Sequence, residues 1–368
     1  MKKILMMINN MNGGGAEKLL LQFIHFFHKH TNYEIHLLLT YNTGIYLKNI
    51  PDYVYKQVIF SEKNPVNEQK IKNEACSISQ NIISNIYDCA VAFLEGSATK
   101  LLAYANIPDN IKYAWVHIDL DKRHYTATLY RDIQEEIECY HHFNKIAVIS
   151  KGVYDAFLKV FGSIFISKLR IIYNPINVND IRKRAKEDSI SYPKFTICSI
   201  GRLMSQKGFD RLISAVAQLK SVDYDFNLII LGDGVRKDEL SALIKKHNLE
   251  NNVFLYGFIE NPYPYLAGCD LYVCSSRTEG YCLAACEAIA LGKPVISTQC
   301  TGVPEIFELC SCGDTFPNST EGIIMGIKKC LDDHAYLCRL KVASELGRFK
   351  FNYEKNFFAM LQFLNLEK

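Results

Sequence analysis

The sequence of 368 residues lacks several features that would place it in a familiar class of protein. No stretch reaches the roughly 18 apolar residues of a transmembrane helix, so we predict no membrane-spanning helix. The net charge of +3 is too small to favour nucleic acid as a partner. The 13 cysteines include no Cys-x-x-Cys pair, which favours reduced, mostly buried cytosolic thiols over a disulfide framework.

Familiar nucleotide and metal motifs are missing as well. Neither the dinucleotide fingerprint Gly-x-Gly-x-x-Gly nor the P-loop pattern occurs, and the hydrolase, zinc-protease and kinase signatures are absent. Two Asp-x-Asp triplets, at 119–121 and 223–225, look like metal motifs, but neither has a histidine or a third carboxylate at ligand spacing. We therefore predict no metal site.

Strand-like and helix-like segments alternate along the chain. A strand, a glycine-containing turn and a helix open each half. This alternation is typical of α/β proteins with parallel sheets. The predicted strands cover 3–8, 34–40, 88–94, 112–118, 145–150, 195–201, 226–232, 253–258, 271–276 and 294–298.

A polar, charged segment that ends at Pro193 separates the two halves. We therefore predict an N-terminal domain over 1–190 and a C-terminal domain over 191–350. The tail, 351–368, is amphipathic and is predicted to form a helix.

Two cations lie in the turn SIGRLMSQKGFD, between a predicted strand and a predicted helix. Loops in this position lie at the carboxyl edge of a parallel sheet, where open α/β proteins bind ligands. The first amides of the helix favour phosphate, and Arg202 and Lys207 add positive charge. The turn fits a diphosphate, although taken alone it is equally well a solvated basic turn.

Two glutamates, Glu279 and Glu287, stand eight residues apart in EGYCLAACEAIALGKPVIST. We predict a helix over 280–291 that Glu279 opens, which would put both side chains on one face and expose amides at the helix start. Glu287 lies in an apolar stretch and needs a hydrogen-bonding partner, either a ribose diol or a buried arginine. Together with the basic turn, the pair predicts a nucleotide-sugar site.

The first half offers two weaker candidates. Gly13–Gly15 follow the first strand and would allow a phosphate or sugar to approach the backbone, or would simply form a tight turn. His117 ends the strand 112–118, which places it on the same rim as the glycines. A lone histidine is, however, more often structural.

Several motifs occur together in a recognisable order: GGAEK, VIS, YNPI, GRLMSQKGFD, LGDG and EGYCLAACEAIALGKPVISTQCTGVPEI. In this order they resemble the retaining glycosyltransferases of family 4, which have the GT-B fold. The resemblance covers nearly the whole chain, most specifically over 195–306 and most loosely over 42–85. It implies an α/β protein of two Rossmann-like domains that face each other across a cleft, with the C-terminal helix crossing back onto the N-terminal, acceptor-side domain.

The resemblance also implies roles for individual residues. Arg202 and Lys207 would bind the donor diphosphate and stabilise the leaving nucleotide, and Glu287 would hold the ribose hydroxyls. Glu279 and His117 would contact the donor sugar. The other implied nucleotide-sugar contacts are Gly14, Gly15, Gly257, Phe258, Tyr281, Cys282 and Leu283.

One pair of positions departs from the family. The pattern often has phenylalanine followed by glycine or proline after the first glutamate, whereas this chain has Tyr281–Cys282. The departure leaves the identity of the sugar open.

The activity that the resemblance implies is retaining transfer of a sugar from a nucleotide diphosphate, expected to be UDP, to a glycan or lipid-linked oligosaccharide. Such enzymes generally need no metal or other cofactor. We expect a cytoplasmic bacterial protein of capsule, O-antigen or other surface-glycan synthesis. The helix Ala16–Lys29 and the basic loop 122–131 offer a peripheral contact with the inner face of the membrane.

Two other functions stay open. A non-hydrolysing UDP-sugar 2-epimerase would convert its donor with no acceptor, and a catalytically silent GT-B scaffold would tolerate alanine at Arg202, Lys207 and Glu279. A retaining glycosidase is disfavoured, because it needs two carboxylates about 5 Å apart and two turns of helix are expected to separate Glu279 from Glu287.

Overall fold

A computed structural model describes residues 2–83 and 86–366 of the chain. The chain divides into two compact units. Unit 1 holds the residues up to Asn174 and those from Glu354 onward, and unit 2 runs from Pro175 to Tyr353. The first division therefore falls earlier than the expected boundary at 190/191.

The charged segment before Pro193 belongs to unit 2 because it contains a helix of its own. Helix α6 (Val178–Arg184) packs against α9 (Tyr263–Gly268) and α10 (Leu283–Ala290). The Arg182 guanidinium donates to the Ala290 carbonyl at 3.4 Å. Polar composition alone suggested a linker, but these contacts attach the segment to the unit that follows it.

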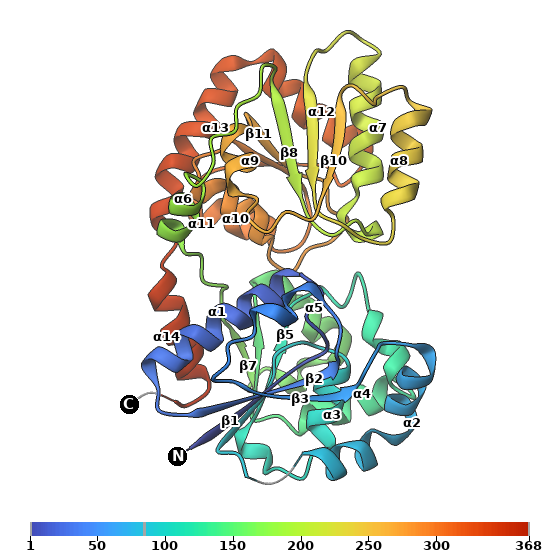
Figure 1. The fold of residues 1–368 in the computed structure, drawn as a ribbon, viewed down its shortest axis with the longest axis vertical. Helices are drawn as coiled ribbons and strands as arrows, with labels where there is room; N and C mark the ends of the chain where they lie inside the picture. Colours follow the sequence, from blue (N-terminus) through green and yellow to red (C-terminus); the bar gives the residue numbers. More distant parts are fainter. Residues whose placement is uncertain (1, 84–85, 367–368) are drawn as a thin grey trace. The chain divides into compact units, whose positions relative to one another are not determined.

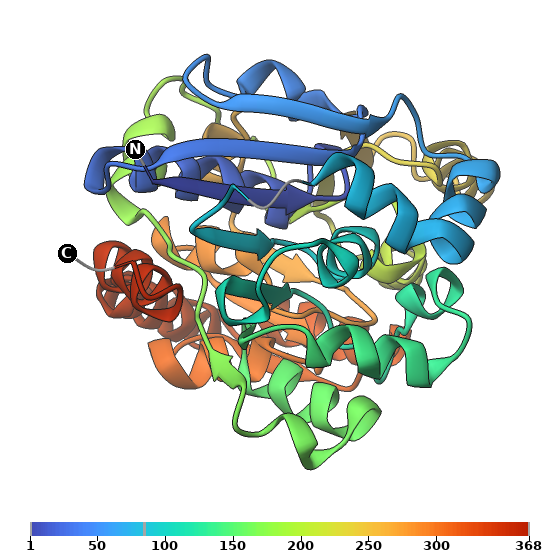
Figure 2. The same ribbon diagram turned by 90° about the horizontal axis from the view of Figure 1, so that it is seen from below.

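Unit 1 is built on a parallel seven-stranded sheet in the order β3-β2-β1-β4-β5-β6-β7. Figure 2 shows this order as a change in colour from blue to green across the sheet. The central strands are almost wholly buried, as expected when helices cover both faces. The strands are β1 (Lys3–Ile8), β2 (Glu34–Tyr41), β3 (Tyr55–Phe60), β4 (Cys89–Ala92), β5 (Lys112–Val116), β6 (Lys145–Val148) and β7 (Leu169–Ile171).

The edge strand β3 was not predicted, because its residues are exposed or only partly buried and lack an apolar run. The helices of unit 1 are α1 (Gly15–His30), α2 (Pro65–Ile82), α3 (Ser97–Tyr104), α4 (Ile133–His141), α5 (Lys151–Phe161) and the C-terminal α14 (Tyr353–Phe363).

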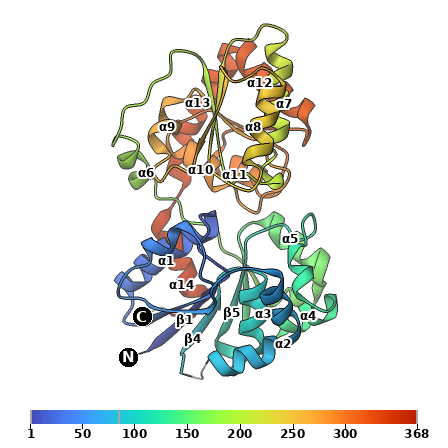
Figure 3. The ribbon, with the colours of Figure 1, turned by 45° about the vertical axis from the view of Figure 1, so that its right-hand side comes forward.

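Helix α14 lies against α1, as Figures 1 and 3 both show. The rings of Phe26 and Phe357 stack with centroids 4.6 Å apart. Farther along, Phe363 meets Trp115 edge-on at 5.3 Å, and the Lys145 ammonium donates to the Asn365 side chain at 2.8 Å. These contacts attach the end of the chain to the sheet with which the chain begins.

Unit 2 is built on a parallel six-stranded sheet in the order β10-β9-β8-β11-β12-β13. Figure 1 shows α7 and α8 on one face of this sheet and α9 and α13 on the other. The strands are β8 (Thr196–Ile200), β9 (Asn227–Leu231), β10 (Val253–Gly257), β11 (Leu271–Cys274), β12 (Val295–Thr298) and β13 (Asp314–Phe316). The helices, besides α6, α9 and α10, are α7 (Phe209–Lys220), α8 (Lys237–Lys246), α11 (Val303–Cys310), α12 (Thr320–Asp332) and α13 (His334–Gly347).

The prediction of two parallel-sheet domains is confirmed. Both sheets share one strand order: the first strand is flanked by the second and the fourth. From the first strand the chain continues to the second and third strands on one side, and from the fourth strand it continues outward on the other side. The loops that follow the first and the fourth strand therefore diverge at the carboxyl edge. In unit 2 these are the loops after β8 and β11, and in unit 1 the loops after β1 and β4.

No helix in the described part of the chain combines the length and the apolar composition that crossing a bilayer requires.

Candidate functional site

The loop after β8 carries Lys207 at the end of a short 3-10 turn, Ser205–Lys207. Gly208 follows with φ +66°, a conformation that side chains other than glycine rarely adopt. A Cβ atom at Gly208 would lie only 2.2 Å from the Ser275 carbonyl oxygen. The Ser275 hydroxyl in turn donates to the Lys207 carbonyl at 2.8 Å. The glycine thus lets the loop after β8 lie directly against the loop after β11.

The two loops also meet through an ion pair. The Lys207 ammonium lies 2.7 Å from Oε1 of Glu279, and the Ser276 hydroxyl donates to the same oxygen at 2.6 Å. Burial by itself would lower the pKa of Lys207, but the charge and hydrogen bond of Glu279, together with the nearby Cys282 and Cys274, outweigh burial and raise the pKa above its usual range. Lys207 therefore stays a cation at neutral pH, while its side chain remains 23% exposed.

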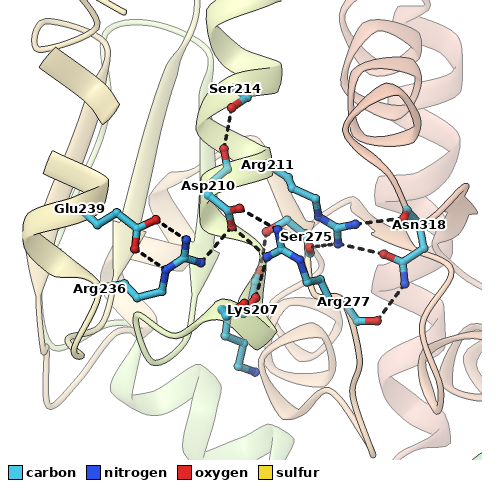
Figure 4. Close-up of polar contacts among 10 residues, drawn as sticks. Lys207, Asp210, Arg211, Ser214, Arg236, Glu239, Ser275, Arg277 and Asn318 are labelled. Carbon is cyan, nitrogen blue, oxygen red and sulfur yellow. Dashed lines mark hydrogen bonds and ion pairs between the residues drawn. The ribbon is translucent and has the colours of Figure 1, made fainter. Parts of the chain in front are cut away.

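A second ion pair fixes the same loops beside the first. The Arg277 guanidinium donates to both carboxylate oxygens of Asp210, at 2.9 and 2.6 Å. The Arg277 amide also donates to the Gln206 carbonyl at 2.7 Å, and the Gln206 side chain returns a hydrogen bond to the Thr278 carbonyl at 3.0 Å. In Figure 4 the Lys207 ammonium points away from the Asp210–Arg277 pair. The pair therefore holds the loops without occupying Lys207.

Two further arginines surround Asp210 (Figure 4). Arg236 reaches Asp210 at 3.3 Å, and Arg211 donates to the Ser275 carbonyl at 2.9 Å. Burial raises the pKa of Asp210, but the hydrogen bonds from Arg277 and the positive charges nearby lower it to about 2. Asp210 is thus ionised throughout the neutral range and joins α7 to the loops after β9 and β11.

Arg202 does not join the Lys207–Glu279 pair. Its side chain is exposed and has no ion pair or hydrogen bond with the rest of the described residues. Gly257 ends β10 with φ +74°, and its carbonyl accepts from the Gly232 amide at 2.7 Å. The next residue, Phe258, has a 41% exposed side chain. These residues border the same carboxyl edge and are open to solvent.

The expected placement of Glu279 and Glu287 on one helix face is wrong. Helix α10 begins at Leu283, after Cys282 as its N-cap, so Glu279 lies in the loop before it. The bonds from Lys207 and Ser276 hold Glu279 in this loop. Glu287 does lie on α10, is buried, and accepts from the Tyr263 hydroxyl at 3.0 Å.

Tyr281 and Cys282 are buried in the connection between Glu279 and α10, and Leu283 is half-buried at the start of the helix. The connection brings these residues close to the Lys207–Glu279 pair in sequence and in space. Unit 2 thus gathers Lys207, Glu279 and the start of α10 around one loop pair.

Unit 1 places Gly14 and Gly15 at the start of α1, with Gly14 as the N-cap. Gly14 is buried, and a Cβ atom there would lie 2.4 Å from Oε2 of the buried Glu17. Gly15 is exposed. The absence of a side chain at Gly14 therefore makes room for the Glu17 carboxylate of the same unit.

His117 follows β5, and its backbone amide donates to Oε2 of the buried Glu95 at 2.8 Å. The other carboxylate oxygen of Glu95 accepts from the Tyr125 hydroxyl at 2.6 Å. Burial lowers the pKa of His117 to about 4, against a hydrogen bond with the Phe93 backbone, so the imidazole is neutral at pH 7. Its Nε2 is buried and has no hydrogen-bond partner among the described residues.

Sequence reasoning missed several polar residues that shape these edges. Asp210 ends the quoted motif GRLMSQKGFD, and Arg277 stands two residues before the quoted motif that begins at Glu279. Their opposite charges, each just after a predicted strand or turn, were the available signal. Glu95 had no such signal, because nothing in the sequence connects it with His117. The missed residues are Glu95, Asp210, Tyr263, Ser276 and Arg277.

A family model matches most of unit 2. Residues 180–345 match the family described as glycosyl transferases group 1. This segment includes every predicted site residue of unit 2. The resemblance to glycosyltransferases is therefore confirmed.

Curated relatives support the same family. A Campylobacter jejuni protein, N-acetylgalactosamine-N,N'-diacetylbacillosaminyl-diphospho-undecaprenol 4-alpha-N-acetylgalactosaminyltransferase, is 39% identical over 186 residues, which are 50% of each chain. The Escherichia coli O-antigen biosynthesis glycosyltransferase WclY is 29% identical over 171 residues, or 45% of this chain and 46% of its own. The chain thus spans about half the length of the curated relatives it matches.

Solved structures resemble the whole chain. Anabaena HepE in complex with UDP and glucose matches with a TM-score of 0.79 and 20% identity, over 99% of this chain and 100% of its own. The lipopolysaccharide glycosyltransferase WaaG matches with a TM-score of 0.72 and 15% identity, over 98% and 99%. These likenesses confirm the predicted GT-B fold.

Proposed function

Because residues 180–345 belong to the glycosyl transferases group 1, we propose that the protein transfers a sugar from a nucleotide diphosphate donor to a glycan or lipid-linked oligosaccharide. The observation that carries this proposal is the Lys207–Glu279 pair, 2.7 Å apart, at the point where the strand order of unit 2 reverses. A fixed cation next to a buried carboxylate suits a ligand in which a diphosphate adjoins sugar hydroxyls.

The proposed reaction breaks the bond between the anomeric carbon of the sugar and the β-phosphate oxygen. Negative charge grows on that oxygen, and Lys207 would neutralise it where it develops. Arg202, exposed on the same loop, would add a second positive charge. The acceptor hydroxyl forms the new bond to the anomeric carbon on the face from which the diphosphate leaves, and it gives its proton to that diphosphate. Because the bond forms on that face, the anomeric configuration is retained.

Within this proposal, Glu279 has two roles. It holds the Lys207 ammonium in place as a cation, and its second carboxylate oxygen would accept a hydrogen bond from a sugar hydroxyl. Glu287, beside the Tyr263 hydroxyl, would hold the ribose. Tyr281, Cys282 and Leu283 would contribute backbone amides, and Gly257–Phe258 would border the base.

We propose UDP as the nucleotide, since HepE was solved with UDP and shares the fold. The lipid-linked saccharide in the name of the Campylobacter jejuni relative suits an acceptor used in surface-glycan synthesis. Gly14, Gly15 and His117 in unit 1 would contribute to donor binding. We propose that the reaction needs no divalent metal, because Lys207 and Arg202 supply positive charge at the diphosphate. We also propose that any membrane contact is peripheral.

The test is a thermal-shift series with UDP, GDP, ADP and their sugar conjugates, each with and without EDTA. One nucleotide family should raise the melting temperature equally with and without EDTA, and Arg202→Ala should reduce that rise. Lys246→Ala provides the matched control, because Lys246 is an exposed cation on α8 of the same unit. Stabilisation that disappears in EDTA would contradict metal independence.

A transfer assay then separates the reaction from binding. The protein should consume the stabilising nucleotide-sugar only when an acceptor glycan is added. Conversion of the donor with no acceptor would favour an epimerase, and no shift with any nucleotide would favour a scaffold.

A further inference from the structure

Two buried thiols lie beside Glu279, one on each side of the loop that carries it. Cys274 ends β11, and Cys282 caps α10. Their sulfur atoms are 3.7 Å apart. The two sulfurs and a carboxylate oxygen of Glu279 all lie within 4.8 Å of one another, and all three residues are buried.

This spacing matches the geometry of a tetrahedral metal. Zinc–sulfur bonds of about 2.3 Å at the tetrahedral angle place two sulfurs about 3.8 Å apart. Two thiolates and one carboxylate form a ligand set that favours zinc and similar thiophilic ions over magnesium or calcium. We propose that Cys274, Cys282 and Glu279 bind a thiophilic divalent cation such as Zn²⁺.

The charges of the filled site balance. Two thiolates and the Glu279 carboxylate carry three negative charges, and the metal and the Lys207 ammonium carry three positive ones. Lys207 bonds to Oε1 of Glu279, which leaves Oε2 for the metal. Because the cluster is buried, a neutral arrangement avoids the cost of leaving an uncompensated charge out of water.

A third buried thiol, Cys300, lies in the loop after β12 and interacts with Cys274. With three ligands from the loop after β11, the fourth position is open to Cys300 or to water.

Metal binding would act on the proposed transfer reaction through Glu279. A carboxylate that coordinates Zn²⁺ cannot accept a hydrogen bond from the donor sugar with the same oxygen. The ion would therefore inhibit transfer, and this consequence rests on the proposed function. The binding itself does not, so the two can fail separately.

The binding test uses Co²⁺, whose bonds to thiolate give a strong near-ultraviolet charge-transfer absorption. The full chain is kept in a phosphine reductant, so that no disulfide forms, and titrated with Co²⁺. We expect the thiolate and tetrahedral bands to saturate at one equivalent and to disappear when Zn²⁺ is added. Cys274→Ala and Cys282→Ser, each checked for folding by circular dichroism, should lose the bands.

The matched control is Cys338→Ala. Cys338 is exposed on α13 and lies 3.6 Å from Nδ1 of His334, which makes that pair the obvious surface competitor for a metal. The control should keep the bands. Bands that vanish in Cys338→Ala, or that persist in both Cys274→Ala and Cys282→Ser, would overturn the proposal.

The inhibition test compares transfer with and without equimolar Zn²⁺. Wild type should lose at least tenfold in rate and recover in EDTA, whereas Cys274→Ala should be active and insensitive to the ion. Equal inhibition of both proteins would overturn the link through this site. If neither protein transfers sugar, the cobalt spectra still decide whether the metal site exists.

Discussion

The two units place a buried glutamate at corresponding points of their sheets and surround it differently. Glu95 follows β4 and Glu279 follows β11, the fourth strand of each unit, next to the first strand. Glu279 is paired with the Lys207 ammonium. Glu95 instead accepts from the Tyr125 hydroxyl and the His117 amide. One strand order thus supports an ion-paired carboxylate in unit 2 and a carboxyl held by a hydroxyl and a backbone amide in unit 1.

The difference is visible in the protonation of each edge. Burial raises the pKa of Glu95, although its hydrogen bonds oppose the shift, and burial makes His117 neutral. In unit 2 the ion pair instead keeps Lys207 charged. The edge of unit 2 therefore keeps a positively charged side chain, whereas the histidine at the corresponding edge of unit 1 is uncharged.

Lys207→Ala tests the contrast between the two units most directly, because it removes the cation from unit 2 and leaves the buried Glu279 carboxylate without its partner. We expect transfer to fall by about 10² to 10³-fold, the usual cost of losing one group that stabilises developing charge. The UDP-induced thermal shift should be lost as well. Lys207→Arg keeps the charge and should retain part of the activity.

Lys246→Ala controls for the general loss of a positive charge from unit 2 and should transfer as wild type does. A Lys207→Ala protein that transfers at the wild-type rate would show that the cation of this pair takes no part in the reaction.

The Asp210–Arg277 ion pair acts as a clamp between the loops after β8 and β11. This clamp can be weakened by substitutions that leave the Lys207–Glu279 pair unchanged. Asp210→Asn and Arg277→Lys should each destabilise unit 2 by roughly 1 to 2 kcal/mol, because the first removes the negative charge of a partly exposed ion pair and the second replaces its two parallel hydrogen bonds by a single contact. The double variant should lose less than the sum of the two. Hydrogen exchange of the β8 and β11 amides measures the effect within the unit.

The dependence on pH gives an independent check of the clamp. The folded-state pKa of Asp210, about 2, lies below the usual value of about 3.9. Its stabilisation is therefore present above about pH 4 and is lost as the pH falls towards 2. Asp210→Asn should lack this contribution, and an unchanged acid sensitivity would show that the pair adds nothing in solution.

Glu287→Gln tests the proposal that Glu287 holds the ribose hydroxyls of the donor. The amide keeps the shape and one acceptor oxygen for Tyr263 but loses the charge. We expect UDP affinity to fall about tenfold, the equivalent of one charge-assisted hydrogen bond. Calorimetric titration with UDP measures this directly. Tyr263→Phe, which leaves the carboxylate in place, should weaken binding less, and wild-type affinity for Glu287→Gln would exclude the ribose role.

The sequence predicted the sheets well, because buried parallel strands appear as apolar runs between turn residues. It also identified the loops in which Lys207 and Glu279 meet, since glycines, cations and carboxylates stand directly after such runs. It did not place Glu279 correctly. A helix was expected from 280 on local propensity, whereas Glu279 is bonded to Lys207 and Ser276 and the helix begins only at Leu283.

Contacts between distant segments account for the other differences. The edge strand β3 is held by pairing with β2 rather than by apolar residues of its own, and the Asp210–Arg277 clamp joins residues 67 apart in sequence. Local patterns carry no information on such partners. The predicted contribution of Arg202 stays a prediction, because the exposed side chain has no fixed position beside Lys207.

The smallest expected effect is that of His117 on the pH dependence of the stability of unit 1. Its folded-state pKa is about 4, below the usual value of about 6.5, so the unfolded chain takes up the proton first as the pH falls. Wild type should therefore lose about 1 kcal/mol from this group between pH 7 and 5.5, and His117→Asn should not. Urea unfolding followed by the fluorescence of Trp115, the single tryptophan of the chain, reports on unit 1 alone.

His124 supplies a control of opposite sign in the same unit. Its hydrogen bond to Glu136, 2.7 Å long, raises the pKa of His124 despite partial burial. The folded state therefore binds the proton more tightly, and its stabilisation is present at low pH and lost as the pH rises through the raised pKa. His124→Asn should make unit 1 more sensitive to acid, whereas His117→Asn should make it less so. If both substitutions shift the acid sensitivity in the same direction, His117 is not held neutral, and the contrast between the two edges reduces to the Lys207–Glu279 pair.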